Sequence, residues 1–340
     1  MSGRFHRALA GEALATPPIW MMRQAGRYQK SYQALRARHS FEALCREPEL
    51  AAAVTLAPIR EFDFDAAILF SDLLFPLEAL GFGLSYATGG PKLDQTLTRA
   101  MCDQFRTTTD ALPHLVFQRD AMAASRAAVP ADKALLGFVG GPWTLFVYAM
   151  EGTHAGALAR SKSSEDIYAA FASRMVPLLI ENIRLQFEGG ADLVMVLDTA
   201  AGELPPAMFR RLVAPNLAKL AAAFPGRLGY YAKASHPAQL SDEAWVSKWA
   251  VVGYDSRWDI ASVLKAPSRT GLVQGNFDPA LLFNDEASFA RSLDEFLAPV
   301  SALAPAERRG WICGLGHGIL PGTPERNVKA FVDTVRERFR

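Results

Sequence analysis

The chain has 340 residues, of which half are hydrophobic and only 21% are charged. Such a composition supports a large buried core and excludes a disordered protein. The formal net charge of +1 excludes the strongly basic character expected for general binding to nucleic acid or to a membrane surface. Three widely spaced cysteines, with no C-x-x-C pair, favour a reducing cytoplasm over secretion. We therefore expect a cytoplasmic protein, with no membrane or nucleic-acid partner.

Short apolar runs alternate with longer helical patterns from residue 66 to the end of the chain. The runs are flanked by Gly, Pro, Asp or Asn and most are too short for helices, so they predict strands. The predicted strands are Ala66–Phe70, Ala134–Val139, Asp192–Leu197, Arg227–Tyr231, Val251–Tyr254, Leu272–Gly275 and Trp311–Gly314. Gly83–Tyr86 is a candidate for a short, irregular eighth strand. The longest helical pattern, Ser164–Glu188, ends at two glycines, as a helix C-terminus should.

The repeated order of strand and helix implies parallel strands joined by right-handed crossovers. Eight strands favour a closed barrel over an open doubly wound sheet, and no low-complexity linker divides the chain. We therefore predict an α/β protein with one domain over residues 1–340. Its fold is a single (β/α)8 TIM barrel with an N-terminal extension, and its active site lies at the C-terminal ends of the strands.

A polar residue follows nearly every predicted strand, as Asp72, Thr199, Lys233, Asp255, Asn276 and His317 do. Active sites of barrels are built from these strand ends, so the pattern indicates an enzyme. The alternative is that these residues only form turns and caps, which strand ends in any α/β protein carry.

The segment Pro18–Tyr28 places Arg23 and Arg27 four residues apart in an otherwise apolar stretch. Burying a guanidinium without a partner is costly, so we expect both side chains to face an anion. Arginine holds carboxylates through a planar, bidentate fork and stays charged at any relevant pH. The alternative is that both arginines are structural and bond barrel carbonyls or acidic side chains.

Three other positions carry chemistry of interest. Asp72 ends an apolar strand and can accept N–H donors or stabilise a cation, although a helix cap is the alternative. The segment Gly137–Gly152 predicts a strand, a Gly-Gly-Pro turn and a helix that bears Tyr148. His317 lies between two glycines, which indicate close approach of backbone and ligand, and it can titrate near neutral pH or donate to an anion.

The segments Pro18–Tyr28, Gly137–Gly152 and Gly314–Pro321 closely resemble motifs of the uroporphyrinogen decarboxylase family, and the resemblance spans nearly the whole chain. It implies decarboxylation of the four acetate side chains of uroporphyrinogen III to methyls, with no cofactor and no metal, in porphyrin and heme biosynthesis. A homodimer is expected from the resemblance alone.

The resemblance also implies roles for individual residues. Asp72 binds the pyrrole N–H groups, and Arg23, Arg27 and His317 bind acetate and propionate groups. Tyr148 lines the pocket and either bonds a substrate carboxylate or supports the aspartate, and Thr199 supplies a hydroxyl where the family usually has serine. The candidate catalytic residues are Asp72, Arg23 and Arg27. Two other departures from the family pattern, at Lys233-Ala234 and at Tyr254–Trp258, concern the shape of the pocket.

Two rival functions stay open. Corrinoid-dependent methyltransferases on a related barrel carry zinc on a His-x-Cys pair near the fifth strand and on a later cysteine, whereas this chain has neither ligand in Tyr230–Ser235. A porphyrin carrier without catalysis would need only the arginines. The sequence contains no P-loop, dinucleotide fingerprint or Cys/His metal spacing, so the predicted partner is a small molecule, with no metal and no cofactor.

Overall fold

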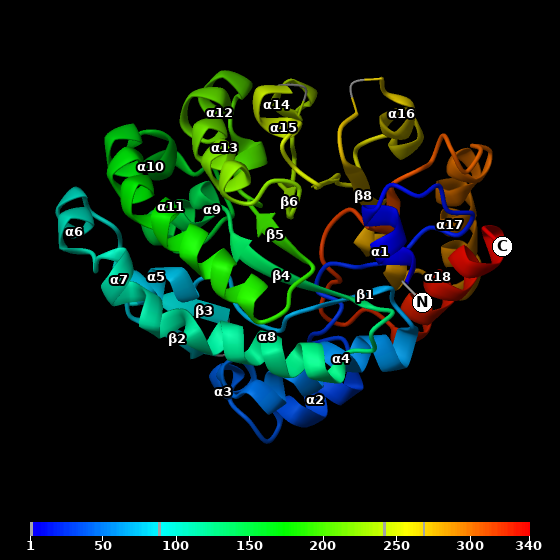
Figure 1. The fold of residues 1–340 in the computed structure, drawn as a ribbon, viewed down its shortest axis with the longest axis horizontal. Helices are drawn as coiled ribbons and strands as arrows, with labels where there is room; N and C mark the ends of the chain where they lie inside the picture. The colour runs from blue at the N-terminus through cyan, green and yellow to red at the C-terminus, as the bar shows by residue number, and fades with distance from the viewer. Residues whose placement is uncertain (1–2, 88–89, 241–242, 268) are drawn as a thin grey trace.

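The computed structural model describes residues 3–87, 90–240, 243–267 and 269–340. In this part of the chain, seven parallel strands form one curled sheet in the order β1-β4-β5-β6-β7-β8-β9, and helices surround it (Figure 1). The strands are β1 (Ala66–Ile68), β4 (Ala134–Gly140), β5 (Leu193–Leu197), β6 (Leu228–Tyr231), β7 (Val251–Gly253), β8 (Leu272–Phe277) and β9 (Trp311–Leu315). All seven predicted strands are confirmed, with ends shifted by a few residues.

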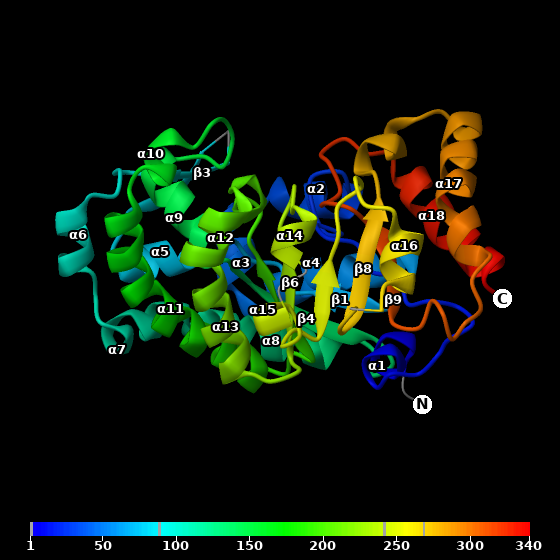
Figure 2. The ribbon, with the colours of Figure 1, turned by 90° about the horizontal axis from the view of Figure 1, so that it is seen from above.

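Apart from α1 (Arg4–Leu9), which contacts β9, the helices before β5 cover one part of the sheet, and those after β5 cover the rest (Figures 1 and 2). The first group is α1, α2 (Lys30–Arg36), α3 (Phe41–Arg46), α4 (Pro48–Phe62), α5 (Phe75–Leu80), α6 (Arg99–Gln104), α7 (Thr108–Ala111), α8 (Val116–Ala128), α9 (Pro142–Glu151), α10 (Ala159–Lys162) and α11 (Glu165–Glu188). The second group is α12 (Pro206–Leu212), α13 (Ala214–Ala223), α14 (Pro237–Leu240), α15 (Glu243–Val246), α16 (Ile260–Lys265), α17 (Glu286–Ser301) and α18 (Glu325–Arg338). Helix α11 confirms the predicted long helix and ends at Gly189.

Alternate side chains of the strands enter two different cores. Side chains such as Leu193, Met195 and Tyr231 fill the barrel interior, whereas their neighbours, such as Val194 and Tyr230, pack beneath the surrounding helices. This period of two is the ordinary geometry of a strand, and burial on both faces explains why the strands read as continuous apolar runs. Among the described residues, no helix has both the length and the apolar character needed to cross a membrane.

The prediction that Gly83–Tyr86 forms the eighth barrel strand is wrong. Strand β2 (Leu84–Ala87) pairs in antiparallel fashion with β3 (Gly90–Leu93) in a separate two-stranded sheet. Two strands joined by a very short loop pair with each other because closing that loop costs little entropy. The hairpin therefore lies outside the barrel wall.

The gap between β9 and β1 is closed instead by the segment 18–22, which lies within the predicted N-terminal extension. Ile19 forms a parallel bridge with Cys313 of β9, and the amide of Trp20 donates to the Cys313 carbonyl at 3.1 Å. On its other side, the Ile19 carbonyl accepts from the amide of Asp65, next to β1, at 2.9 Å. Trp20 enters the barrel interior whereas Ile19 enters the outer core. The segment therefore takes the place of an eighth strand.

Asp65 joins both ends of the chain to this closure. Its buried carboxylate accepts from the Ile19 amide at 2.7 Å and from Arg336 of α18 at 2.7 Å. It also pairs with Arg4 of α1 at 3.3 Å. The two termini accordingly lie on the same side of the molecule (Figure 2).

Candidate active site

A cavity of about 610 Å³ opens at the carboxyl ends of the strands. Its walls come from the closing segment and the turn after it, from α2, from the ends of β1 and β5, from the β2–β3 hairpin, from α9 and from the loop after β9. All six residues predicted from the sequence line it, namely Arg23, Arg27, Asp72, Tyr148, Thr199 and His317. Barrels that bind small molecules use this end of the sheet.

Arg23 and Arg27 are exposed within the open cavity, so the expectation of buried guanidinium groups is wrong. The buried residues of this segment include the four apolar residues between the prolines and Arg23, together with Gln24 and Tyr28. Among the described residues, neither guanidinium group has a hydrogen bond or an ion pair. The geometry therefore does not support the alternative in which both arginines bond to the barrel, and it leaves two cations free to hold an anion.

The position of Arg23 depends on a glycine from the opposite end of the chain. Arg23 has φ +57°, a left-handed conformation that is unusual for a residue with a side chain. A Cβ atom on Gly318 would lie 2.4 Å from Arg23 Cδ, which is far inside van der Waals contact. Gly318 therefore provides the space that the Arg23 side chain occupies.

Asp72 lies just beyond β1 and is the acidic residue among the described residues that line the cavity. Its Oδ1 accepts from the amide of Leu74 at 2.8 Å. Leu74 is itself the N-cap residue of α5, and no side chain in the described part of the chain caps this helix, so Asp72 forms a turn before α5 and is not its cap. Burial raises the pKa of Asp72 to about 6, while the Leu74 amide, the Tyr86 hydroxyl and Arg23 act in the opposite direction. The carboxylate thus lies in a site that gives it little solvation.

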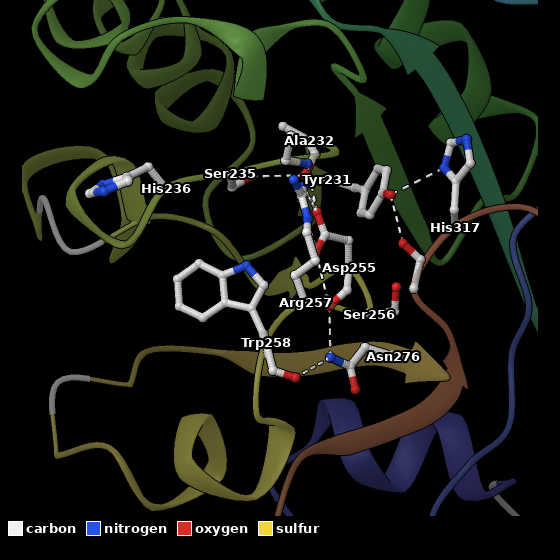
Figure 3. Close-up of polar contacts among 12 residues, drawn as sticks. Tyr231, Ala232, Ser235, His236, Asp255, Ser256, Arg257, Trp258, Asn276 and His317 are labelled. Carbon is white, nitrogen blue, oxygen red and sulfur yellow. Dashed lines mark hydrogen bonds and ion pairs between the residues drawn. The ribbon is translucent and has the colours of Figure 1, made fainter. Parts of the chain in front are cut away.

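His317 lies in the loop after β9 and contacts Tyr231 of β6. The two rings are stacked, with centroids 5.8 Å apart, and Tyr231 Oη lies 3.1 Å from His317 Nδ1 (Figure 3). Burial, together with the positive charges of Arg23 and Lys233, lowers the pKa of His317 to about 4. Of the two possibilities for His317, titration near neutral pH is therefore not supported, whereas donation to an anion stays a prediction.

Tyr148 and Thr199 complete the predicted set. The Tyr148 hydroxyl lies 2.6 Å from Nδ1 of His154, in the loop after α9, and burial raises the pKa of Tyr148. Thr199 follows β5 directly and lines the cavity with its neighbour Leu197. Both residues therefore line the same cavity as the arginines.

Two of the other polar residues at strand ends, Asp255 and Asn276, have structural contacts. Asp255 accepts from the amide of Ala234 at 2.6 Å and forms an ion pair with Arg257. Asn276 donates to the carbonyl oxygens of Asp255 and Trp258, at 2.7 and 2.8 Å (Figure 3). For these two residues the turn-forming alternative is correct.

Two cavity residues escaped the sequence analysis. Arg36, at the end of α2, is a third arginine in the lining. Its positive charge, nine residues after Arg27, was the sequence feature that could have indicated a third anion-binding residue. Tyr86 of β2 has a buried hydroxyl without a hydrogen-bond partner among the described residues, close enough to Asp72 to favour its ionised form. Placing Tyr86 requires the hairpin, which the sequence pattern did not reveal.

A parallel barrel with an arginine-lined cavity at its strand ends defines an α/β-barrel enzyme that acts on an anionic small molecule. Residues 2–338 match the family model described as uroporphyrinogen decarboxylase (URO-D). The uroporphyrinogen decarboxylase of Anaeromyxobacter dehalogenans is 38% identical over 359 residues, covering 98% of both chains. That of Roseobacter denitrificans is 35% identical over 347 residues, covering 97% of both. The chain belongs to the uroporphyrinogen decarboxylase family.

Among solved structures, a methyltransferase from Methanosarcina mazei superposes with a TM-score of 0.73 at 21% identity, covering 99% of this chain and 98% of that one. At this identity the similarity concerns the fold alone. Within the described residues, no group of three or more His, Cys, Asp or Glu side chains is arranged to hold a metal ion.

Proposed function

We propose that this chain is a uroporphyrinogen decarboxylase, which converts the four acetate side chains of uroporphyrinogen III to methyls and releases four CO₂. Family membership over residues 2–338 supports the proposal. The observation that carries it in the structure is one cavity in which Arg23 and Arg27, which have no ion pair with any residue the structure describes, face the same space as Asp72. A flexible macrocycle with carboxylates at its rim and N–H groups at its centre matches that arrangement.

Each decarboxylation needs an electron sink. Protonation of the ring carbon next to the one that bears the acetate makes the pyrrole cationic, and the C–C bond to the carboxylate, which is conjugated with that cation, then breaks. Its electron pair neutralises the ring, CO₂ leaves, and an exocyclic methylene remains. Protonation of this methylene gives the methyl group, and the ring carbon then loses the proton added first, which restores the pyrrole. One proton is consumed for each CO₂ released.

In this mechanism Asp72 binds the pyrrole N–H groups and stabilises the cationic ring from a poorly solvated position. Arg23, Arg27 and His317 hold side-chain carboxylates, and Tyr148 and Thr199 complete the pocket. We assign catalytic roles to Asp72, Arg23 and Arg27. Free arginine is a poor acid, so its task is to bind and orient the reacting carboxylate.

The proposal extends to the whole chain: one catalytic domain that works without cofactor or metal, as a homodimer in the cytoplasm. The methyltransferase alternative is less well supported, because the solved methyltransferase shares the fold at 21% identity whereas the curated decarboxylases reach 38%. A porphyrin carrier would use the same arginines and predicts binding without CO₂ release.

An anaerobic assay with uroporphyrinogen III separates these functions. We expect products with progressively fewer carboxylates, ending in coproporphyrinogen III, and activity that persists after extensive chelation. Binding without loss of carboxylates would instead identify a carrier. Activity that is abolished by chelation and restored by zinc would contradict the cofactor-free reaction.

A further inference from the structure

The contact between Tyr231 and His317 defines where the imidazole carries its proton. Tyr231 is fully buried, and its Oη lies 2.7 Å from the carbonyl oxygen of Gly316 and 3.1 Å from His317 Nδ1. A carbonyl oxygen only accepts hydrogen bonds, so the single hydroxyl proton of Tyr231 is donated to Gly316. The contact with His317 can then form only if Nδ1–H is the donor and the tyrosine oxygen the acceptor (Figure 3).

This arrangement determines the state of the other ring nitrogen. A neutral imidazole carries one proton, so a ring protonated at Nδ1 has an unprotonated Nε2 that can only accept. The stacking of the two rings, with an interplanar angle of 20°, restrains the imidazole in this orientation. Because His317 lines the cavity while Nδ1 is engaged by Tyr231, Nε2 is the nitrogen available to a ligand.

We propose that Tyr231 is a positioning residue that holds neutral His317 as its Nδ1–H tautomer, so that a substrate carboxylate binds at Nε2 only together with one proton. The carboxylate part of this inference rests on the proposed function. The proton comes from solution and is shared between Nε2 and a carboxylate oxygen, and no electrons are transferred. A carboxylate oxygen and an unprotonated Nε2 both carry lone pairs and repel each other. Binding of the carboxylate at Nε2 is therefore linked to the uptake of a proton.

The charges around His317 support this linkage. Arg23 from the closing segment, Lys233 after β6 and His154 after α9 disfavour a protonated ring, whereas Asp255 after β7 favours it. Burial and the balance of these charges lower the pKa of His317 to about 4, so the imidazole ring is neutral at pH 7. An incoming carboxylate adds the opposite charge at Nε2 and favours protonation.

The tautomer can be measured on the protein without ligand. We would record ¹⁵N spectra of histidine-labelled wild type, assign His317 by its loss in His317→Gln, and compare Tyr231→Phe. We expect the Nδ1–H tautomer in the wild type and a shift toward Nε2–H in Tyr231→Phe. Tyr230→Phe is the matched control, because Tyr230 is also fully buried but faces the outer core, and it should leave the His317 signal unchanged. An Nε2–H tautomer in the wild type would overturn the inference even if Tyr231→Phe failed to fold.

Calorimetric titration with coproporphyrinogen III, the expected product, tests the linkage. Under anaerobic conditions at pH 7.5, heats in phosphate and in Tris give the number of protons taken up. We expect wild type to take up about one more proton than His317→Gln, and Tyr231→Phe to lose most of that difference, since its Nε2–H can donate directly. Equal uptake in wild type and His317→Gln would refute the linkage. An absence of binding would refute the proposed function and, with it, the carboxylate step, while the tautomer measurement would still decide the role of Tyr231.

Discussion

Asp72 is the residue on which the proposed chemistry depends most directly. Its Oδ1 already bonds the Leu74 amide, so the second oxygen and the negative charge are what the carboxylate can offer a substrate. The Tyr86 hydroxyl nearby is buried and makes no hydrogen bond with the described residues. A substrate N–H donor would therefore meet a carboxylate that the Leu74 amide and the Tyr86 hydroxyl already flank.

Asp72→Asn keeps the size of the side chain and the oxygen that accepts from Leu74, but it removes the charge. Asparagine forms such a turn as aspartate does, so thermal stability should change little. If the charge stabilises a pyrrolic cation, kcat should fall on the order of a thousandfold. Asp72→Glu keeps the charge one methylene away and should retain more activity. A folded asparagine variant within about threefold of wild type would exclude this mechanism.

The pH dependence of kcat/KM gives a second measurement on the same residue. Since the pKa of Asp72 is raised to about 6, the free enzyme loses the carboxylate as the pH falls through that value. Activity should therefore decline below about pH 6, and this acid limb should be missing in Asp72→Asn. Circular dichroism over the same range would show that the decline is not unfolding.

At the scale of elements, the loop after β9 controls the shape of the segment that carries the arginines. Gly318 makes room for the Arg23 side chain, and the Ile319 amide donates to the Met22 carbonyl at 2.9 Å. A cavity wall built in this way is sensitive to a single added methyl group.

Gly318→Ala should displace Arg23 and lower kcat/KM at least tenfold, about 1.4 kcal/mol in transition-state terms. The φ of Gly318 is not in the left-handed region, so alanine fits the backbone and the fold should persist. A double-mutant cycle tests the cause: in an Arg23→Ala background, Gly318→Ala should cost little more. Additive losses would show that Gly318 acts by another route.

Elements that follow local patterning were predictable from the sequence, whereas contacts between distant segments were not. The strand at Leu193–Leu197 reads directly as a buried apolar run. The hairpin at β2 was misassigned because its partner, Gly90–Leu93, has little strand character. The wall role of Ile19 depends on pairing with Cys313, which no local pattern encodes.

The candidate site shows the same division. All six predicted residues line one cavity, because strand ends and motif residues are local features. Their roles stay predictions. The proposed tautomer of His317 depends on Tyr231, which lies 86 residues earlier in the chain. The space for the Arg23 side chain depends on Gly318. Such cross-chain packing could be found only in three dimensions.

At the scale of the whole molecule, Asp65 holds both ends of the chain against β1. Asp65→Ala would leave Arg336, whose side chain is 14% exposed, without its carboxylate, and it would release the Ile19 amide. Removing one partner of a buried pair typically costs about 3–5 kcal/mol, so the urea midpoint should fall clearly. Asp103→Ala removes the partner of Arg99 in an exposed pair and should leave the midpoint nearly unchanged. Equal midpoints for both variants would show that Asp65 does not stabilise the closure.

The closure of the barrel by the segment 18–22 also determines when the barrel can close during synthesis of the chain. On the ribosome, Ile19 is made early, while its partner Cys313 follows roughly 290 residues later, about 15–60 s at ordinary rates of synthesis. Throughout that interval the segment has no strand on one side, and the arginines behind it have no cavity to line. A chain released before β9 is complete therefore lacks both the wall and the site. Enzymatic activity is therefore expected only from chains whose synthesis has passed β9.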